Sequence, residues 1–157
     1  MWKNEEYLKE VENHLKNFYG DFIEESNVFI PPFSKYYHQE MGTPLFKKFV
    51  ATNYLTQHIN LSSIKKHCIF VEDKFRISGK RTVNIDPILL DMEKVLVATT
   101  KYRGNRIQID KNLYLEIELW YHNKEFKPFL WTYKDYFENT EFFLKVRKKL
   151  KNKLKAL

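Results

Sequence analysis

The strongest constraint on the fold is a strict alternation of apolar and polar residues over residues 113–119. Four aliphatic residues occupy the odd positions, and Tyr114, Glu116 and Glu118 occupy the even ones. Successive side chains of a β-strand point to opposite faces, so this pattern predicts a strand with one buried and one solvated face. We therefore expect Glu116 and Glu118 on the solvated face of an antiparallel sheet.

Apolar runs near this segment predict its neighbours in the sheet. Residues 95–98 form a run short enough for a buried strand, and residues 126–133 follow a predicted turn and are expected to complete a hairpin. Pro128 lies within this second run. Because proline cannot donate a hydrogen bond to a neighbouring strand, we expect Pro128 at an edge or at an unpaired position.

Strand signals in the first half of the chain are weaker. Residues 27–30 precede a proline pair and predict a first strand, while residues 67–71 and 75–77 flank a charged connection and predict a hairpin. Residues 45–57 fit both a helical and a strand period, and we favour a strand. These patterns together predict an α+β fold with an antiparallel sheet of about five to seven strands.

Helices are predicted at both ends of the chain. Over residues 4–25 apolar residues recur in steps of three and four, and Asn4 is a suitable N-cap. A final helix with an apolar stripe is predicted after residue 139. A chain of 157 residues with few glycines and prolines is expected to form one domain. Its predicted parts are an N-terminal helix (1–25), a β-rich core (26–138) and a basic amphipathic C-terminal helix (139–157).

The net charge is concentrated at the C-terminal end. The formal net charge is +7, seven lysines and arginines lie within residues 145–155, and no acidic residue follows Glu141. This asymmetry predicts a polyanionic partner. The single cysteine, Cys68, excludes an internal disulfide, and no apolar run is long enough to cross a membrane. We therefore expect a cytoplasmic protein without a membrane span.

Motifs for catalysis or for cofactors are not found in the sequence. The five histidines are scattered and the four glycines are isolated, so neither a metal motif nor a phosphate loop is predicted. Glu116 is followed by Ile117 and Glu118, whereas a nuclease of the Asp then Glu-x-Lys type requires lysine two residues after the glutamate. Cys68 and His67 would point to opposite sides of a strand. We predict no enzymatic activity, no metal and no cofactor.

Two loops carry the other notable basic residues. A Ser-Gly-Lys-Arg-Thr stretch contains Lys80 and Arg81, and a second loop contains Arg103 and Arg106 beside a tyrosine. Such loops can contact a phosphate backbone or enter a groove of DNA. Each phosphate that they neutralise releases counterions, so several contacts would give a salt-sensitive affinity.

Short motifs in this chain are similar in order and spacing to those of the ComK family of competence transcription factors. That family carries a Cys-x-Phe strand, a basic turn and a Pro-Ile segment leading to an apolar run that ends in threonine. A Tyr-x-x-Phe-Glu-Asn-like segment before a basic helix is a further similarity. The matching segments are residues 68–70, 78–82, 86–91, 95–99 and 133–139.

The resemblance implies a DNA-binding transcription activator that recognises AT-rich sites through the minor groove and assembles as a homo-oligomer. Narrow AT-rich minor grooves attract inserted arginine and lysine side chains, which agrees with the basic loops. The residues expected to contact double-stranded DNA are Lys80, Arg81, Arg103 and Arg106 in the loops, and Arg147, Lys148, Lys149 and Lys151 on the final helix.

Two alternatives stay open. One is a pleckstrin-like module whose basic helix meets an acidic lipid surface or protein, and the other is a small phage-type inhibitor.

Overall fold

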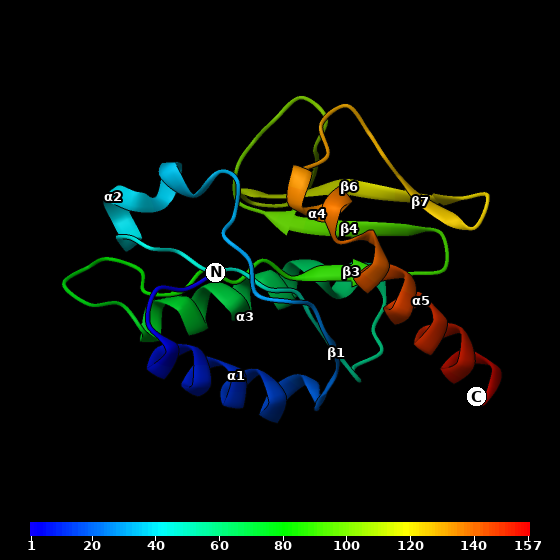
Figure 1. Ribbon diagram of the computed structural model, residues 1–157, viewed down its shortest axis with the longest axis horizontal. Coiled ribbons are helices and arrows are strands. Elements are labelled where there is room, and N and C mark those ends of the chain that lie inside the picture. Colours follow the sequence, from blue (N-terminus) through cyan, green and yellow to red (C-terminus); the bar gives the residue numbers. More distant parts are fainter. The chain divides into compact units, whose positions relative to one another are not determined.

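The computed structural model describes all 157 residues, which form two compact units. Unit 1 comprises Met1–Thr56 and Lys66–Ile85, and unit 2 comprises Gln57–Lys65 and Asp86–Leu157. The predicted α+β class is confirmed, with a helix near each end of the sequence and the strands of two antiparallel sheets among the intervening residues (Figure 1). No helix combines the length and the apolar character needed to cross a membrane.

Unit 1 is built from two long helices, a two-stranded sheet and short helical turns. Its elements are α1 (Glu5–Tyr19), β1 (Phe22–Glu25), η1 (Ser34–Tyr37), α2 (His38–Met41), β2 (Val50–Thr52) and the greater part of α3 (Leu61–Lys74). Trp2, Val11, Val71 and Val83 form its buried core, and apolar residues of α1 pack against them. The stripe predicted for the first helix therefore does face a core.

Helix α1 begins as predicted but ends earlier. The Asn4 side chain accepts a hydrogen bond from the backbone N–H of Glu6 at 2.8 Å, which confirms the N-cap. The helix ends at Tyr19 because Gly20 adopts a φ of 80°, a backbone conformation that glycine reaches without steric cost, while its N–H still donates to the Lys16 carbonyl. The prediction of helix through residue 25 was therefore wrong, and Phe22–Glu25 pairs with β2 instead.

The hairpin predicted for residues 67–71 and 75–77 is also wrong, because Leu61–Lys74 forms helix α3. The apolar residues Leu61, Ile64, Cys68 and Val71 follow one another in steps of three, four and three, which is the helical period. The run of apolar residues at 68–71 fits a strand only when it is considered alone. The apolar period over the whole segment from Leu61 to Val71 therefore indicates the helix that is observed.

The other weak strand signals have mixed outcomes. Residues 27–30 make only one isolated bridge, between Phe29 and Lys47, so the predicted first strand is not formed. Within residues 45–57 a strand does form, over Val50–Thr52. The five-stranded antiparallel sheet agrees with the predicted sheet of about five to seven strands, and a two-stranded sheet is present in addition.

Unit 2 contains a five-stranded antiparallel sheet and the C-terminal helices. Its elements are η2 (His58–Asn60), the start of α3, β3 (Ile88–Leu90), β4 (Lys94–Thr99), β5 (Ile107–Asp110), β6 (Leu113–His122), β7 (Glu125–Pro128), α4 (Lys134–Glu138) and α5 (Thr140–Lys155). The strand order is β3-β4-β6-β5, and β7 pairs with the second half of β6. Pro128 lies in β7, an edge strand, as predicted.

The long strand β6 organises unit 2, because it pairs with β4, β5 and β7. Leu115 and Ile117 of β6 pack against a buried cluster to which Leu61 and Leu96 belong. Helix α5 begins beside the sheet, where Phe143 is buried, and runs away from it towards the C-terminus (Figure 1). The first turn of α5 is therefore part of the core, whereas its later turns extend beyond the sheet.

Candidate functional site

Strand β6 carries two carboxylates that the fold buries. Glu116 and Glu118 are 1% and 0% exposed, so the prediction of a solvated strand face was wrong for both. The chain after β7 continues along the edge of β6, where Trp131 Nε1 donates to the Ile117 carbonyl at 2.9 Å and Thr132 Oγ1 donates to the Glu118 carbonyl at 2.5 Å. It then reaches the buried carboxylates, because the Tyr133 backbone N–H donates to the Glu118 side chain. Alternation within one strand cannot reveal a contacting segment that lies more than ten residues further along the chain.

Glu118 lies at an irregularity in the pairing of β4 with β6. Val95 pairs with Leu119 and Leu96 pairs with Ile117, so Glu118 has no partner residue on β4. One extra residue on a strand constitutes a β-bulge, a feature that redirects side chains and occurs often beside functional sites. The buried group of Glu116, Glu118 and their partners is called the carboxylate cluster below.

Within the carboxylate cluster, Glu116 is held as an anion. Arg106 Nε donates to Glu116 Oε2 at 2.6 Å, and Asn105 Nδ2 donates to the same oxygen at 2.6 Å. Arg106 also donates to the Lys101 carbonyl at 2.6 Å and to the Tyr133 hydroxyl at 3.2 Å. Burial raises the pKa of Glu116, but the hydrogen bonds from Arg106, Glu118 and Asn105 outweigh burial and lower the pKa.

The pKa of Glu118 is shifted in the opposite direction to that of Glu116. Its Oε2 accepts a hydrogen bond from the Tyr133 backbone N–H at 3.2 Å, and its carboxyl group, when protonated, is placed to donate a hydrogen bond to Glu116. Burial, followed by the adjacent Glu116 carboxylate, raises the pKa of Glu118 to about 9. The cluster therefore holds one ionised and one protonated carboxyl group at neutral pH, a division typical of two carboxylates that share a site.

Arg106 was predicted to contact DNA, but its side chain is 1% exposed and paired with Glu116. The Arg106 guanidinium therefore neutralises the Glu116 carboxylate within the cluster. Arg103, in the same loop, is exposed, and its guanidinium lies 5.5 Å from the centre of the Tyr133 ring. Of the two arginines predicted in this loop, only Arg103 is therefore accessible to a partner.

The other predicted loop lies in unit 1, and one of its two predicted basic residues is likewise paired within the protein while the other is exposed. Arg81 donates to both carboxylate oxygens of Glu40 at 2.7 and 2.8 Å, to Glu72 at 3.3 Å and to Asn84 at 2.7 Å. Hydrogen bonds from Arg81 lower the pKa of Glu40. Because bidentate pairs of this kind are strong, Arg81 joins the loop to α2 and α3. Lys80 is exposed.

A shallow pocket of about 310 Å³ lies at this loop of unit 1. Lys3, His38, Lys80 and Thr82 are among the residues that line it, and Glu40 lies on the same wall. The side chains could hold a small anion, but the Glu40 carboxylate offsets part of their positive charge. Lys80 therefore lines the same pocket as Lys3, a proximity that the sequence did not predict.

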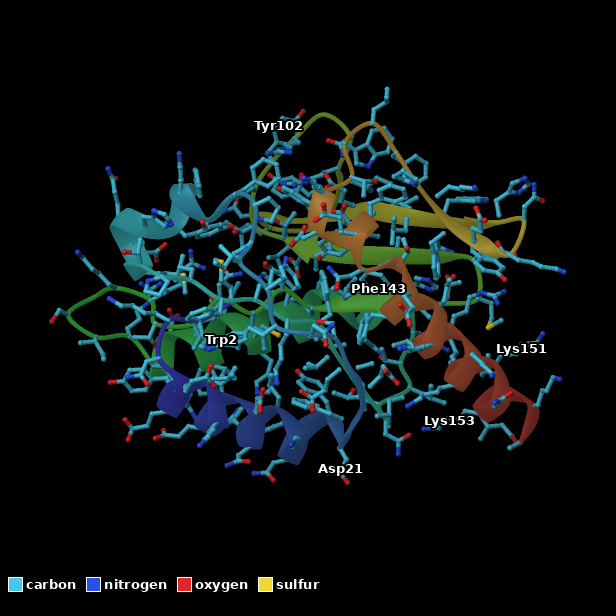
Figure 2. The ribbon with its side chains drawn as sticks, viewed as in Figure 1. Trp2, Asp21, Tyr102, Phe143, Lys151 and Lys153 are labelled. Carbon is cyan, nitrogen blue, oxygen red and sulfur yellow. The ribbon has the colours of Figure 1, made fainter.

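Helix α5 carries the remaining predicted residues. Arg147 is held against unit 2, with its guanidinium 3.3 Å from the centre of the Tyr121 ring and its Nε donating to the Met92 carbonyl at 2.8 Å. Lys148, Lys149 and Lys151 are exposed. Figure 2 shows Lys151 and Lys153 on the late turns of α5, at a distance from Phe143 at its start. The predicted lysines of α5 therefore form its accessible basic surface.

One family model matches the chain, over residues 1–150, and its description is a domain of unknown function (DUF4416). No curated protein and no solved structure matches the chain significantly. The match gives no link to the ComK family, so that resemblance stays a prediction from short motifs. Because the matched residues include both units and most of α5, the chain belongs to the DUF4416 family.

Proposed function

We propose that the protein binds double-stranded nucleic acid, and DNA in particular, through the basic surface of α5. The observation that carries the proposal is the charge of this helix, which has seven cations and one acidic residue, Glu141. Lys148, Lys149 and Lys151 are exposed, so their side chains can reach phosphates. Lysine binds phosphate as a point charge and needs no fixed geometry.

The spacing of the lysines suits an elongated anion. Helix α5 has 16 residues and is therefore about 24 Å long. Lys148, Lys151 and Lys155 follow one another in steps of three and four, so they lie along one side of the helix. A phosphate backbone that runs along this side would meet successive charges, and each contact would release counterions.

We expect phosphate contacts to dominate over base readout. Arginine is the side chain best suited to bidentate recognition of bases, but Arg81, Arg106 and Arg147 each donate hydrogen bonds within the protein. Lys80 and Arg103 are the predicted loop cations left exposed. A ComK-like preference for AT-rich DNA would have to come from these two residues, so the preference is expected to be small.

A second candidate is an anionic membrane surface. Leu154 and Leu157 are 48% and 87% exposed at the end of α5, beside its lysines. A basic helix with exposed leucines can lie in the headgroup region of an acidic bilayer. Binding to anionic vesicles that persists after nuclease treatment would favour this candidate over nucleic acid.

A charge-neutralising variant tests the proposal. Replacing Lys148, Lys149 and Lys151 together with glutamine is expected to weaken duplex DNA binding at least about tenfold at low salt, by a similar factor for AT-rich and GC-rich duplexes, because phosphate contacts are lost. Fluorescence anisotropy with labelled duplexes measures the effect.

The matched control removes the same charge elsewhere on unit 2. Lys111, Lys124 and Lys134 are exposed and lie outside α5, so their replacement with glutamine should leave most of the affinity intact. Equal losses in the two triple variants would mean that net charge alone matters. A triple variant of α5 that binds as tightly as the wild type would contradict the proposal.

A further inference from the structure

Aromatic rings from α1, from α3 and from the residues after β2 adjoin one another in unit 1. The ring centre of His67 lies 4.4 Å from that of Phe18 and 6.4 Å from that of Phe70. Each remaining ring centre lies 4.9 or 5.5 Å from that of another member. The group is called the ring cluster below, and it consists of His14, Phe18, Tyr19, Tyr54, His67 and Phe70.

Three rings of the ring cluster are accessible to solvent. Phe18, Phe70 and Tyr54 are 59%, 54% and 48% exposed. Burial of such side chains is favourable, yet the buried core of unit 1 is formed by other residues. A single exposed apolar residue is ordinary, but a group of adjoining exposed rings is typical of an interaction surface.

Polar contacts hold the ring cluster together. The Tyr19 hydroxyl lies 2.5 Å from His67 Nδ1, and His67 Nε2 lies 3.3 Å from His14 Nε2. These contacts join α1 to α3, so Phe18 of one helix and Phe70 of the other are both held beside the His67 ring. A surface that is already ordered avoids much of the entropy cost of arranging its side chains when a ligand binds.

Cations lie beside the exposed rings. Lys66, Phe70 and Lys74 follow one another in steps of four, so they form one row on α3, and both lysines are exposed. Lys74 Nζ lies 4.4 Å from the centre of the Phe70 ring. The acidic residue next to Lys74, Asp73, is paired with Arg76 at 2.6 Å. A ligand suited to this surface therefore combines flat rings with negative charge.

We propose that the ring cluster binds single-stranded nucleic acid, with bases stacked on Phe18 and Phe70 and with phosphates contacted by Lys66 and Lys74. Every nucleobase has a π-face, so aromatic side chains beside cations bind single strands with little regard to sequence. In a duplex these faces are covered by the neighbouring base pairs. The site goes beyond the duplex binding proposed for α5 and is separate from it, because all its residues belong to unit 1.

The test compares two single-stranded ligands of the full-length protein by fluorescence anisotropy. One is a labelled oligothymidylate, and the other is a labelled abasic oligomer of the same length, which has the phosphates but no bases. The wild type should bind the oligothymidylate at least about tenfold more tightly, because stacking acts on this ligand alone. Equal affinity for the two ligands, or binding of neither, would overturn the proposal.

Two double variants distinguish stacking from apolar contact. Phe18→Leu/Phe70→Leu keeps apolar side chains at both exposed positions but removes the rings, so its affinity for the oligothymidylate should fall at least about tenfold, towards that for the abasic oligomer. Phe18→Tyr/Phe70→Tyr keeps the rings and should bind as the wild type does. A leucine variant that retains the wild-type preference for bases would overturn the proposal, and the ring cluster would then be an apolar docking surface for a protein.

Two further variants locate the effect. Phe137→Leu removes a ring that is 49% exposed in unit 2, and it should leave the preference for bases unchanged. Replacing Lys148, Lys149 and Lys151 of α5 with glutamine should also retain this preference, even if both single strands bind more weakly, because α5 contacts only phosphates. Failure of duplex binding by α5 would therefore leave the base preference in place. Loss of the base preference in either variant would place the stacking surface outside the ring cluster and overturn the proposal.

Discussion

Replacing Arg106 with alanine is expected to lower the free energy of unfolding by about 3–5 kcal/mol, because the substitution leaves the Glu116 anion buried without its main partner. The two side chains are 1% and 0% exposed, and Arg106 Nε lies 2.6 Å from Glu116 Oε2. The change also removes the hydrogen bonds to the Lys101 carbonyl and to Tyr133. Urea unfolding followed by circular dichroism measures the effect.

Arg103→Ala is the matched control for this prediction. Arg103 is in the same loop, but its side chain is exposed and its main contact is with the face of the Tyr133 ring. Contacts of this kind at exposed sites contribute about 0.5–1 kcal/mol, so the control should lose no more than that. An Arg106→Ala protein that unfolds within about 1 kcal/mol of the wild type would show that Glu116 is not buried as an anion.

Glu118→Gln is expected to remove a pH dependence of stability at neutral to alkaline pH. The ordinary glutamate pKa is about 4.3, whereas burial raises the pKa of Glu118 to about 9 in the folded protein. Between these values the folded protein retains a proton that the unfolded chain has released. The stability that Glu118 contributes is therefore full below pH 4.3 and falls as pH rises, by up to about 1.4 kcal/mol per pH unit, until pH 9.

The glutamine variant lacks this titration. Its side-chain oxygen can still accept from the Tyr133 backbone N–H, and its amide can donate towards Glu116 as a protonated Glu118 would. At pH 7 the variant should therefore be more stable than the wild type by up to about 4 kcal/mol, and its stability should be nearly constant from pH 7 to 9.

Unfolding free energies at pH 7, 8 and 9 give the comparison, with Glu93→Gln as a control that changes an exposed carboxyl group in the same unit. The control should keep the wild-type slope. Parallel slopes in the wild type and in Glu118→Gln would mean that Glu118 is ionised in the folded protein, in contradiction to its buried position in the β-bulge.

Local patterns predicted the elements that depend on local interactions. The alternation in β6, the N-cap at Asn4 and the apolar stripe at the start of α5 each involve residues within a few positions of one another. The α+β class follows from such patterns. Helix α3 was missed because four adjacent residues resemble a strand, whereas the steps between Leu61 and Val71 show the helical period only in a longer window.

The candidate site was less predictable, because its contacts join distant parts of the chain. Arg81 and its carboxylate partner Glu40 are 41 residues apart, and the segment that contacts Glu118 follows β7. A sequence shows which residues are charged but not which charges are already paired. Lys148, Lys149 and Lys151 were easier to place, because an amphipathic helix leaves its polar face exposed whatever the rest of the fold.

The salt dependence of duplex binding tests the central claim most directly. The equilibrium constant for the wild type and for the α5 triple glutamine variant would be measured from about 50 to 200 mM salt, and its logarithm plotted against that of the salt concentration. The proposal predicts a linear fall for the wild type and a slope that is smaller by about 3 in the variant, one unit for each lost phosphate contact. Wild-type affinity that is independent of salt, or an unchanged slope in the variant, would show that α5 does not bind the phosphate backbone.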